Sequence, residues 1–113
     1  MSEIRLREFE ELVLLCVLAA RPEAYGASIQ RVLEEEAGRS ATLGAIHTAL
    51  DRLTHKGLVL SAMGDPKPVR GGRRKRQYEL TSSGLEEVAN TRRIRERLWK
   101  KVNVRSLEGE AGP

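Results

Sequence analysis

The sequence TLGAIHTALDRLTHKGLVLSAMGDPKPVRGGRRKRQYELTSSG, residues 42–84, contains the pattern from which the architecture can be worked out. Its first part has apolar residues at steps of three and four, which predicts a helix with one buried face: Ile46, Ala49, Leu50 and Leu53. Ser40 or Thr42 can cap the start of this helix. Lys56-Gly57 places a cation and a glycine where helices commonly end, so we expect the helix to stop there.

A long β-hairpin is predicted directly after that helix. Residues 58–60 form a short β-prone run, and residues 76–80 alternate between polar and apolar side chains. Between them, the glycines and prolines of residues 64–68 and 71–72 exclude regular structure. Two strands joined by a loop of about ten residues form a wing, and such a loop is longer than the commonest hairpin connections.

Two further helices are predicted upstream. The first has apolar residues at helical spacing: Leu6, Phe9, Leu12, Val13, Cys16, Val17 and Ala20. Because Leu14, Leu15 and Leu18 add apolar surface on other sides, we expect a central helix with several neighbours. The second runs from Tyr25-Gly26 to a stop at Gly38. Three short helices with tight turns form a helix-turn-helix, and the wing makes it a winged helix.

A fourth helix is predicted from Ser82 to about Val102, roughly 30 Å long at 1.5 Å per residue, with Ser83 or Thr81 as its cap. Its apolar positions are Leu85, Val88, Ala89, Ile94, Leu98, Trp99 and Val102. The chain offers its far end no obvious place to be buried, so a second copy is the natural partner. We interpret Trp99 as a packing residue rather than part of a ligand box. Residues 104–113, with two glycines and a proline, are predicted to be a flexible tail.

Composition excludes several classes of protein. With 113 residues the chain has room for one domain. The single cysteine excludes a disulfide within the chain and a cysteine metal cluster, and it fits a reducing compartment. The two histidines cannot form a zinc site without carboxylates. The longest apolar run has nine residues, far short of the roughly 20 that span a bilayer. The glutamates before it indicate neither a signal nor a transit peptide. We therefore expect a cytoplasmic protein without a metal or cofactor.

The charge is unevenly distributed along the chain. The net charge is +4, from 20 Lys and Arg against 16 Asp and Glu. Residues 1–39 have a balance of −3, whereas residues 40–113 have a balance of +7. Such a division suggests that the second half faces a polyanion, either nucleic acid or an anionic membrane.

The wing loop is the strongest chemical signal. Residues 67–76 contain six cations and no acid: Lys67, Arg70, Arg73, Arg74, Lys75 and Arg76. Arginine guanidinium groups suit phosphate and also fit a narrow minor groove. We favour phosphate contact over a solvated loop, and affinity from such contacts falls with salt.

The helix before the wing is the candidate reader of base edges. Small residues at its start, Thr42, Gly44 and Ala45, would let the backbone approach a groove floor. His47, Thr48 and Arg52 could then reach bases or phosphates. This helix alone is equally well interpreted as an ordinary surface helix, and His47 as a plain surface residue. The wing that follows it favours groove entry.

The remaining candidates carry weaker interpretations. The fourth helix carries a second basic run: Arg92, Arg93, Arg95, Arg97, Lys100 and Lys101. We interpret this run as a solvated face rather than as a contact with DNA or a membrane. Cys16 lies in an apolar stripe, so we interpret it as a core thiol rather than a redox sensor. No serine has a plausible base and no carboxylate pair is evident, so we predict no enzymatic activity.

In order along the chain, these residues resemble the PadR-like winged-helix transcriptional regulators. The resemblance rests on "LREFEELVLLCVL", "YGASIQRVLEE" and residues 42–84, and it covers about residues 5–100. The matching positions within residues 42–84 are Gly44, Leu50-Asp51-Arg52-Leu53, Lys56-Gly57-Leu58, Gly71-Gly72-Arg73, Lys75-Arg76, Leu80-Thr81 and Gly84. One departure stands out, because the family commonly has Tyr where this chain has His47. Base preference could differ there, or His47 could add pH sensitivity.

The resemblance implies a homodimeric regulator, usually a repressor, that binds a pseudo-palindromic operator in duplex DNA. We expect a mainly α (α+β) fold with a winged helix-turn-helix in residues 1–81, a dimerisation helix in 82–103 and a tail in 104–113. The predicted DNA-binding residues are Thr42, Gly44, Ala45, His47, Thr48, Arg52, Arg70, Arg73, Arg74 and Lys75. The predicted dimerisation residues are Leu6, Phe9, Leu85, Val88, Leu98, Trp99 and Val102. A small-molecule effector, if there is one, would have to use the dimer interface. The alternative is an interaction module whose basic wing binds an acidic partner or RNA.

Overall fold

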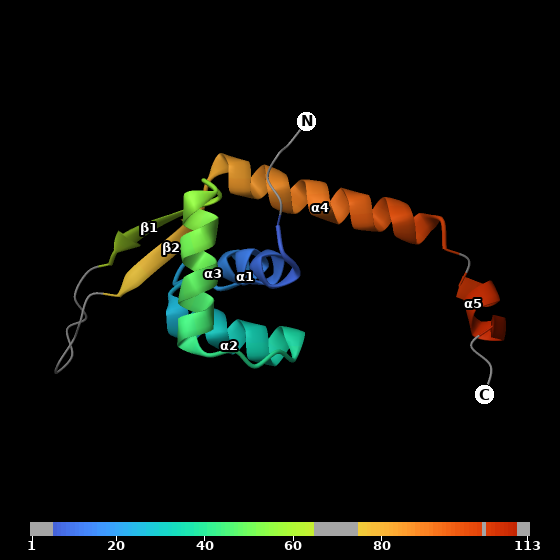
Figure 1. Ribbon diagram of the computed structural model, residues 1–113, viewed down its shortest axis with the longest axis horizontal. Coiled ribbons are helices and arrows are strands. Elements are labelled where there is room, and N and C mark those ends of the chain that lie inside the picture. The colour runs from blue at the N-terminus through green and yellow to red at the C-terminus, as the bar shows by residue number, and fades with distance from the viewer. Residues whose placement is uncertain (1–5, 65–74, 103, 111–113) are drawn as a thin grey trace.

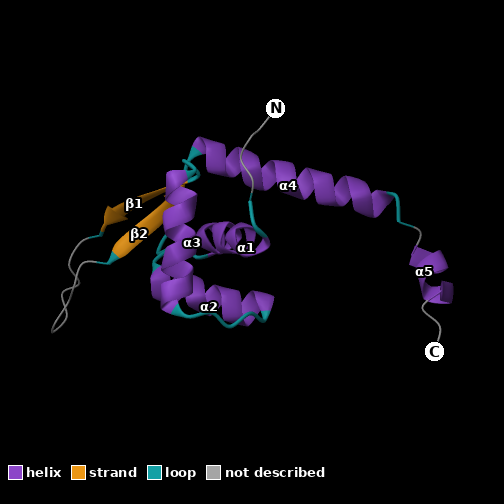
Figure 2. Cartoon of the chain, in the orientation of Figure 1, coloured by secondary structure: helices purple, strands orange, loops and turns teal. Residues whose placement is uncertain are grey.

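The computed structural model describes residues 6–64, 75–102 and 104–110, and it confirms the predicted fold class. Three helices come first: α1 (Glu8–Ala19), α2 (Gly26–Ala37) and α3 (Leu43–His55). The strands β1 (Val59–Met63) and β2 (Arg76–Leu80) follow, and then the helices α4 (Ser82–Lys100) and α5 (Val104–Glu110). Figures 1 and 2 show α1–α3 as one body, with the two strands leaving it on one side and α4 running along its top.

The core lies between α1, α2 and α3 and extends under the strands. Its fully buried large side chains are Leu14, Ile29, Leu33, Ile46, Leu50, Leu53, Leu58, Val13, Val17 and Val59. The stripes predicted for the first and third helices supply Val13, Val17, Ile46, Leu50 and Leu53, whereas Leu58 and Val59 come from the β-prone run. The helix α1 contacts α2, α3, β2 and α4, which confirms the expectation of a central helix.

The helix ends have clear chemical causes. Thr42 caps α3, since its hydroxyl accepts a hydrogen bond from the Ala45 N–H at 3.0 Å. Thr81 caps α4 in the same way, accepting from the Gly84 N–H at 3.0 Å. Of the alternatives left open by the sequence, Thr42 and Thr81 are therefore the caps. Gly38 ends α2 in a left-handed conformation with φ of 62°.

The strands form an antiparallel hairpin with Val59 opposite Leu80 and Met63 opposite Arg76. This confirms the predicted wing, although β1 is longer than its apolar run. The hairpin is tied to the body where the Tyr78 N–H donates to the Ala24 carbonyl at 2.8 Å. The tip of the wing, residues 65–74, lies outside the described residues.

The helix α4 packs tightly against the body at its start and then extends away from it. Gly84 is buried against the Leu58 carbonyl, where a Cβ would lie only 2.1 Å from that oxygen. The molecule measures 59 × 38 × 21 Å, and its radius of gyration is 17.3 Å. A compact chain of this length would have about 13 Å. The excess comes from α4 and α5, which extend beyond the core (Figure 1).

The end of the chain differs from the prediction. Residues 104–110 form the helix α5, whereas we expected an irregular tail from residue 104 on. Val104 and Leu107 are three positions apart and share a helix face, and Gly109 falls only in the last turn. The remaining glycine and proline follow residue 110, so they do not prevent a helix over residues 104–110.

Candidate nucleic-acid interface

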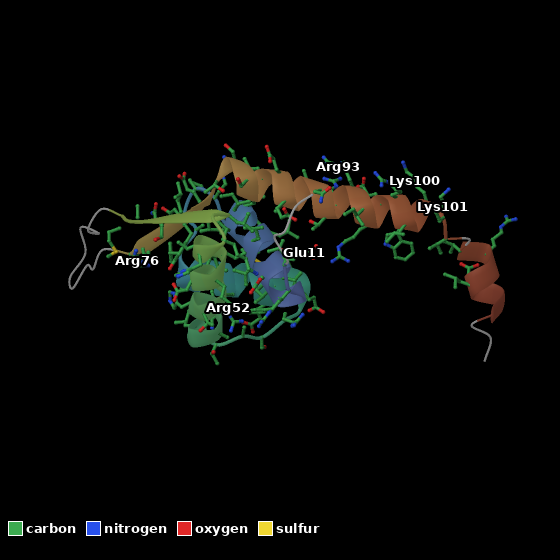
Figure 3. All side chains as sticks on the ribbon, turned by 45° about the horizontal axis from the view of Figure 1, so that its top comes forward. Glu11, Arg52, Arg76, Arg93, Lys100 and Lys101 are labelled. Atoms are coloured by element: carbon green, nitrogen blue, oxygen red, sulfur yellow. The ribbon has the colours of Figure 1, made fainter. Side chains whose placement is uncertain are left out.

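The predicted contact residues of α3 share its outward side. We call this surface the α3 face, and its exposed members are Thr42, Gly44, Ala45, His47, Thr48 and Arg52. The opposite side of the helix is buried through Ile46, Ala49, Leu50 and Leu53. Because core packing holds α3 from behind, its outward side is presented on a rigid element. Figure 3 labels Arg52 on this helix.

The first turn of α2 lies against the α3 face. A Cβ placed on Gly26 would be 3.1 Å from His47 Nε2 and 3.2 Å from its Cε1. The glycine therefore leaves room for the imidazole ring, and a larger residue would push that ring away. The exposed His47 therefore lies next to the first residue of α2.

The root of the wing joins the same surface. Lys75 Nζ lies 4.1 Å from the centre of the Tyr25 ring, a cation–π contact. Tyr25 immediately precedes Gly26, so neighbouring residues contact the wing and α3. The sequence analysis missed this bridge. The available signal was an aromatic residue directly before a helix, in a chain with only four aromatic residues.

The other wing cations divide into two groups. Arg76 is exposed at the wing root, and its Nη1 donates to the Ser61 hydroxyl on the neighbouring strand at 3.1 Å. Arg70, Arg73 and Arg74, which we predicted to bind DNA, lie outside the described residues.

The second basic run lies elsewhere. In Figure 3, Arg93, Lys100 and Lys101 stand on the upper side of α4, away from Arg52 on α3 and Arg76 on the wing. Two members are paired with acids: Arg92 with Glu96 of the same helix, and Arg95 with Glu11 of α1. The run is exposed along its length, and it does not extend the surface made by α3 and the wing.

A buried carboxylate fixes the C-terminal end of α3. The side chain of Glu10 is 3% exposed and pairs with Lys56, the residue that ends α3. Burial by itself would raise the pKa of Glu10. The hydrogen bonds from Lys56 and the Arg7 N–H and the charges of these residues outweigh it, so the pKa lies below its usual value. Nothing in the sequence distinguishes Glu10 from Glu8 and Glu11 beside it.

The predicted dimerisation residues fall into a partly buried group and an exposed group. Leu6, Phe9 and Val88 are partly buried against the core of the same chain. Four others are exposed: Leu85 at 48%, Leu98 at 62%, Trp99 at 66% and Val102 at 38%. Leu98 and Trp99 lie at the distal end of α4 and Val102 lies two residues beyond it, where the described part of the chain has no core to cover them.

Other kinds of site find little support. Cys16 is buried, and burial raises the pKa of its thiol, as expected of a core residue rather than a reactive thiolate. The described residues contain no group of three His, Cys, Asp or Glu side chains that could hold a metal ion. None of the helices in the described ranges is long and apolar enough to cross a bilayer.

Comparison with known proteins gives a consistent result. A sequence profile described as the transcriptional regulator PadR-like family matches residues 14–90. A PadR family transcription regulator from Clostridium difficile is similar in structure, with 28% identity and a TM-score of 0.60, covering 86% of this chain and 97% of that one. RosR of H. salinarum has a TM-score of 0.69 at 24% identity, covering 97% of this chain and 92% of that one.

A solved complex of a similar protein contains DNA. It is Bacillus subtilis PadR with operator DNA, at 26% identity and a TM-score of 0.60, covering 74% of this chain. This chain spans only 46% of the length of that protein. No curated protein sequence matches the chain significantly.

Proposed function

Because this chain belongs to the PadR-like family of transcriptional regulators, we propose that it binds duplex DNA as a homodimer and represses transcription from a pseudo-palindromic operator. The observation that carries this proposal is that the α3 face and Lys75 of the wing root meet at the start of α2, where the buried Gly26 lies next to His47 and Tyr25 contacts Lys75. A helix and a basic hairpin presented side by side suit a major groove and the phosphates that border it.

Residue roles follow from position on this surface. The α3 face enters the major groove, where Gly44 and Ala45 permit close approach and His47, Thr48 and Arg52 reach polar groups. Lys75, with Arg70, Arg73 and Arg74 on the loop it borders, neutralises phosphates or enters the adjacent minor groove. The RNA-binding and acidic-partner alternatives do not require small residues at the exposed start of α3, so Gly44 and Ala45 favour entry into a DNA groove.

The homodimer accounts for the exposed end of α4. Leu98, Trp99 and Val102 pack against a second copy, together with the first helix. Two copies related by a two-fold axis place their α3 helices about one DNA turn apart, roughly 34 Å. Bound to such an operator, the dimer blocks access to a promoter that overlaps it. A small-molecule effector would have to bind between the two copies.

Selection from random duplex DNA tests this function. We expect recovery of an inverted repeat whose half-sites are separated by about one helical turn. Salt-sensitive binding without a recovered motif would instead identify a general polyanion binder and contradict the proposal.

A further inference from the structure

The first turn of α1 holds three acids, and each pairs with a cation from a different part of the chain. Glu8 pairs with Arg39 in the connection between α2 and α3, and Glu10 with Lys56 at the end of α3. Glu11 pairs with Arg95 on α4, 84 positions away. Carboxylates in a first turn stabilise a helix through its dipole, and this effect needs no cationic partner. Three long-range pairs from one turn therefore call for a further explanation.

We infer that Glu10 and Glu11 are positioning residues, which hold α3 and α4 at a fixed angle to each other through α1. In the homodimer proposed above, that angle sets the distance between the two α3 helices, and so the operator spacing that the protein prefers. This inference rests on the proposed function for its DNA consequence, but the angle itself is a property of one chain.

The Glu10 contact secures α3 at its C-terminal end. Its Oε1 accepts from Lys56 and, at 3.3 Å, from the Arg7 N–H at the start of α1. Lys56 in turn is the C-terminal cap of α3, and its N–H donates to the Arg52 carbonyl at 3.0 Å. The carboxylate thus connects the beginning of one helix to the end of another.

The Glu11 contact has a geometry that restricts angle. Arg95 Nε lies 3.0 Å from Glu11 Oε1, and Arg95 Nη2 lies 2.6 Å from Glu11 Oε2. Two parallel hydrogen bonds between planar groups define an orientation as well as a distance. The Glu11 side chain is only 14% exposed, so the carboxylate has little freedom to follow a moving partner. Figure 3 shows Glu11 on the body below α4.

Apart from the Glu11–Arg95 pair, few contacts of α4 fix the angle between α3 and α4. Gly84 and Val88 contact the body near the start of the helix. Beyond Thr91, Arg95 is the one described residue of α4 whose side chain makes a polar contact with another element. The 19 residues of α4 span about 28 Å, so a rotation of about 10° at its start moves its end by about 5 Å. One base-pair step is about 3.4 Å, so such a rotation would change the preferred spacing.

The angle can be measured within a single chain. Spin labels at Asp51→Cys and Lys100→Cys, in a Cys16→Ala background, report the distance from α3 to α4 by double electron–electron resonance. An excess of unlabelled chain removes distances between copies. We expect a narrow distribution for the parent, and Glu11→Gln or Arg95→Gln to widen it at least about twofold.

Two controls separate positioning from folding. The exchange Glu11→Arg with Arg95→Glu restores an ion pair and should restore the narrow distribution. Arg92→Gln removes a pair that lies within α4 and should leave the distribution unchanged. Unchanged distributions in both Glu11→Gln and Arg95→Gln, in variants that melt like the parent, would overturn the inference.

Duplexes with the half-site separation changed by one base pair test the consequence for DNA. The parent should prefer one spacing by at least tenfold, and Arg95→Gln should reduce this preference to about threefold or less. Affinity for a single half-site should not change. A widened distribution with an undiminished spacing preference would overturn the link to the operator. If the parent binds no inverted repeat, the proposed function fails, while the distance measurement still decides whether Glu11 and Arg95 position α4.

Discussion

Two glycines of this chain differ in how closely other atoms surround them. Gly84 lies against backbone, since a Cβ there would meet the Leu58 carbonyl oxygen at 2.1 Å. Gly44 lies on the α3 face, where the nearest atom to a Cβ would be Thr42 Oγ1 at 3.8 Å. The first glycine is required for packing, whereas the second leaves space that only a partner would fill.

Alanine at these two positions should therefore act in opposite directions. Gly84→Ala should lower the free energy of unfolding by roughly 1–3 kcal/mol, because backbone cannot move aside as a flexible side chain can. Gly44→Ala should raise it by up to about 1 kcal/mol, because alanine favours the helix. Urea unfolding at neutral pH measures both. Gly44→Ala should nevertheless weaken duplex binding, and unchanged affinity would contradict close approach at this position.

Glu10 gives the stability of the fold a pH dependence. Glu10→Gln keeps an acceptor for Lys56 and the Arg7 N–H but removes the charge, and should cost about 1 kcal/mol at pH 7. The folded pKa of Glu10 lies below its ordinary value of 4.5, so the charge stabilises the fold above that value. This contribution is lost as the pH falls through the folded pKa.

Unfolding at pH 7 and at pH 3 checks the prediction for Glu10. The difference between parent and Glu10→Gln should shrink at the lower pH. The exposed Glu35 offers a matched control, and Glu35→Gln should have little effect at either pH. A difference for Glu10→Gln that stays constant with pH would show that the carboxylate charge does not stabilise the fold.

At the scale of elements, α3 and the wing act as one unit because α2 begins between them. Tyr25 contacts Lys75 of the wing, and Gly26 accommodates His47 of α3. The Tyr78 N–H hydrogen bond to the Ala24 carbonyl fixes the hairpin next to this junction. The wing therefore leaves the body at a defined place beside the α3 face.

The wing should carry the sequence-independent part of DNA affinity. Arg73→Ala with Arg74→Ala should weaken binding to all duplexes and reduce the salt slope of log K by about 1 to 2 units. The matched control removes two cations from α4, Arg93→Ala with Lys100→Ala, and should leave the slope unchanged. Fluorescence anisotropy over a series of salt concentrations measures both variants. A slope that falls equally in both would contradict a wing-specific contact.

At the scale of the whole molecule, the C-terminal helices extend beyond the packed core. The radius of gyration of 17.3 Å reflects a helix α4 whose distal apolar residues are not covered by any of the residues that the structure describes. Exposed apolar patches of this kind commonly mark an interface, since burying them removes apolar surface from water. A second copy is the partner that we propose for this patch.

Charge on that patch should separate the copies. Leu98→Glu with Trp99→Glu should give monomers in light scattering, because each carboxylate would lose its hydration on association. Leu60 is similarly exposed, at 61%, but lies on the wing, and Leu60→Glu should leave the oligomeric state unchanged. A dimer that survives the double substitution would place the interface elsewhere.

Local pattern was sufficient for much of this protein. The helices of the core and the hairpin follow from periodicity and from glycine at fixed offsets, which are properties of neighbouring residues. The choice of Thr42 over Ser40 and of Thr81 over Ser83 as helix caps required the structure. The α3 face is set in the same way, since a helix with one apolar stripe must expose the opposite side. The helix α5 was missed because the two glycines and the proline of residues 104–113 outweighed a short apolar spacing that they do not interrupt.

Contacts between distant residues required the tertiary structure. Three acids in one turn of α1 look alike in the sequence, and only the fold assigns Glu10 to Lys56 and Glu11 to Arg95. Tyr25 and Gly26 became parts of the candidate site by their distances to Lys75 and His47. The physical reason is that charge pairing and close packing depend on separation in space, which chain spacing determines only within an element.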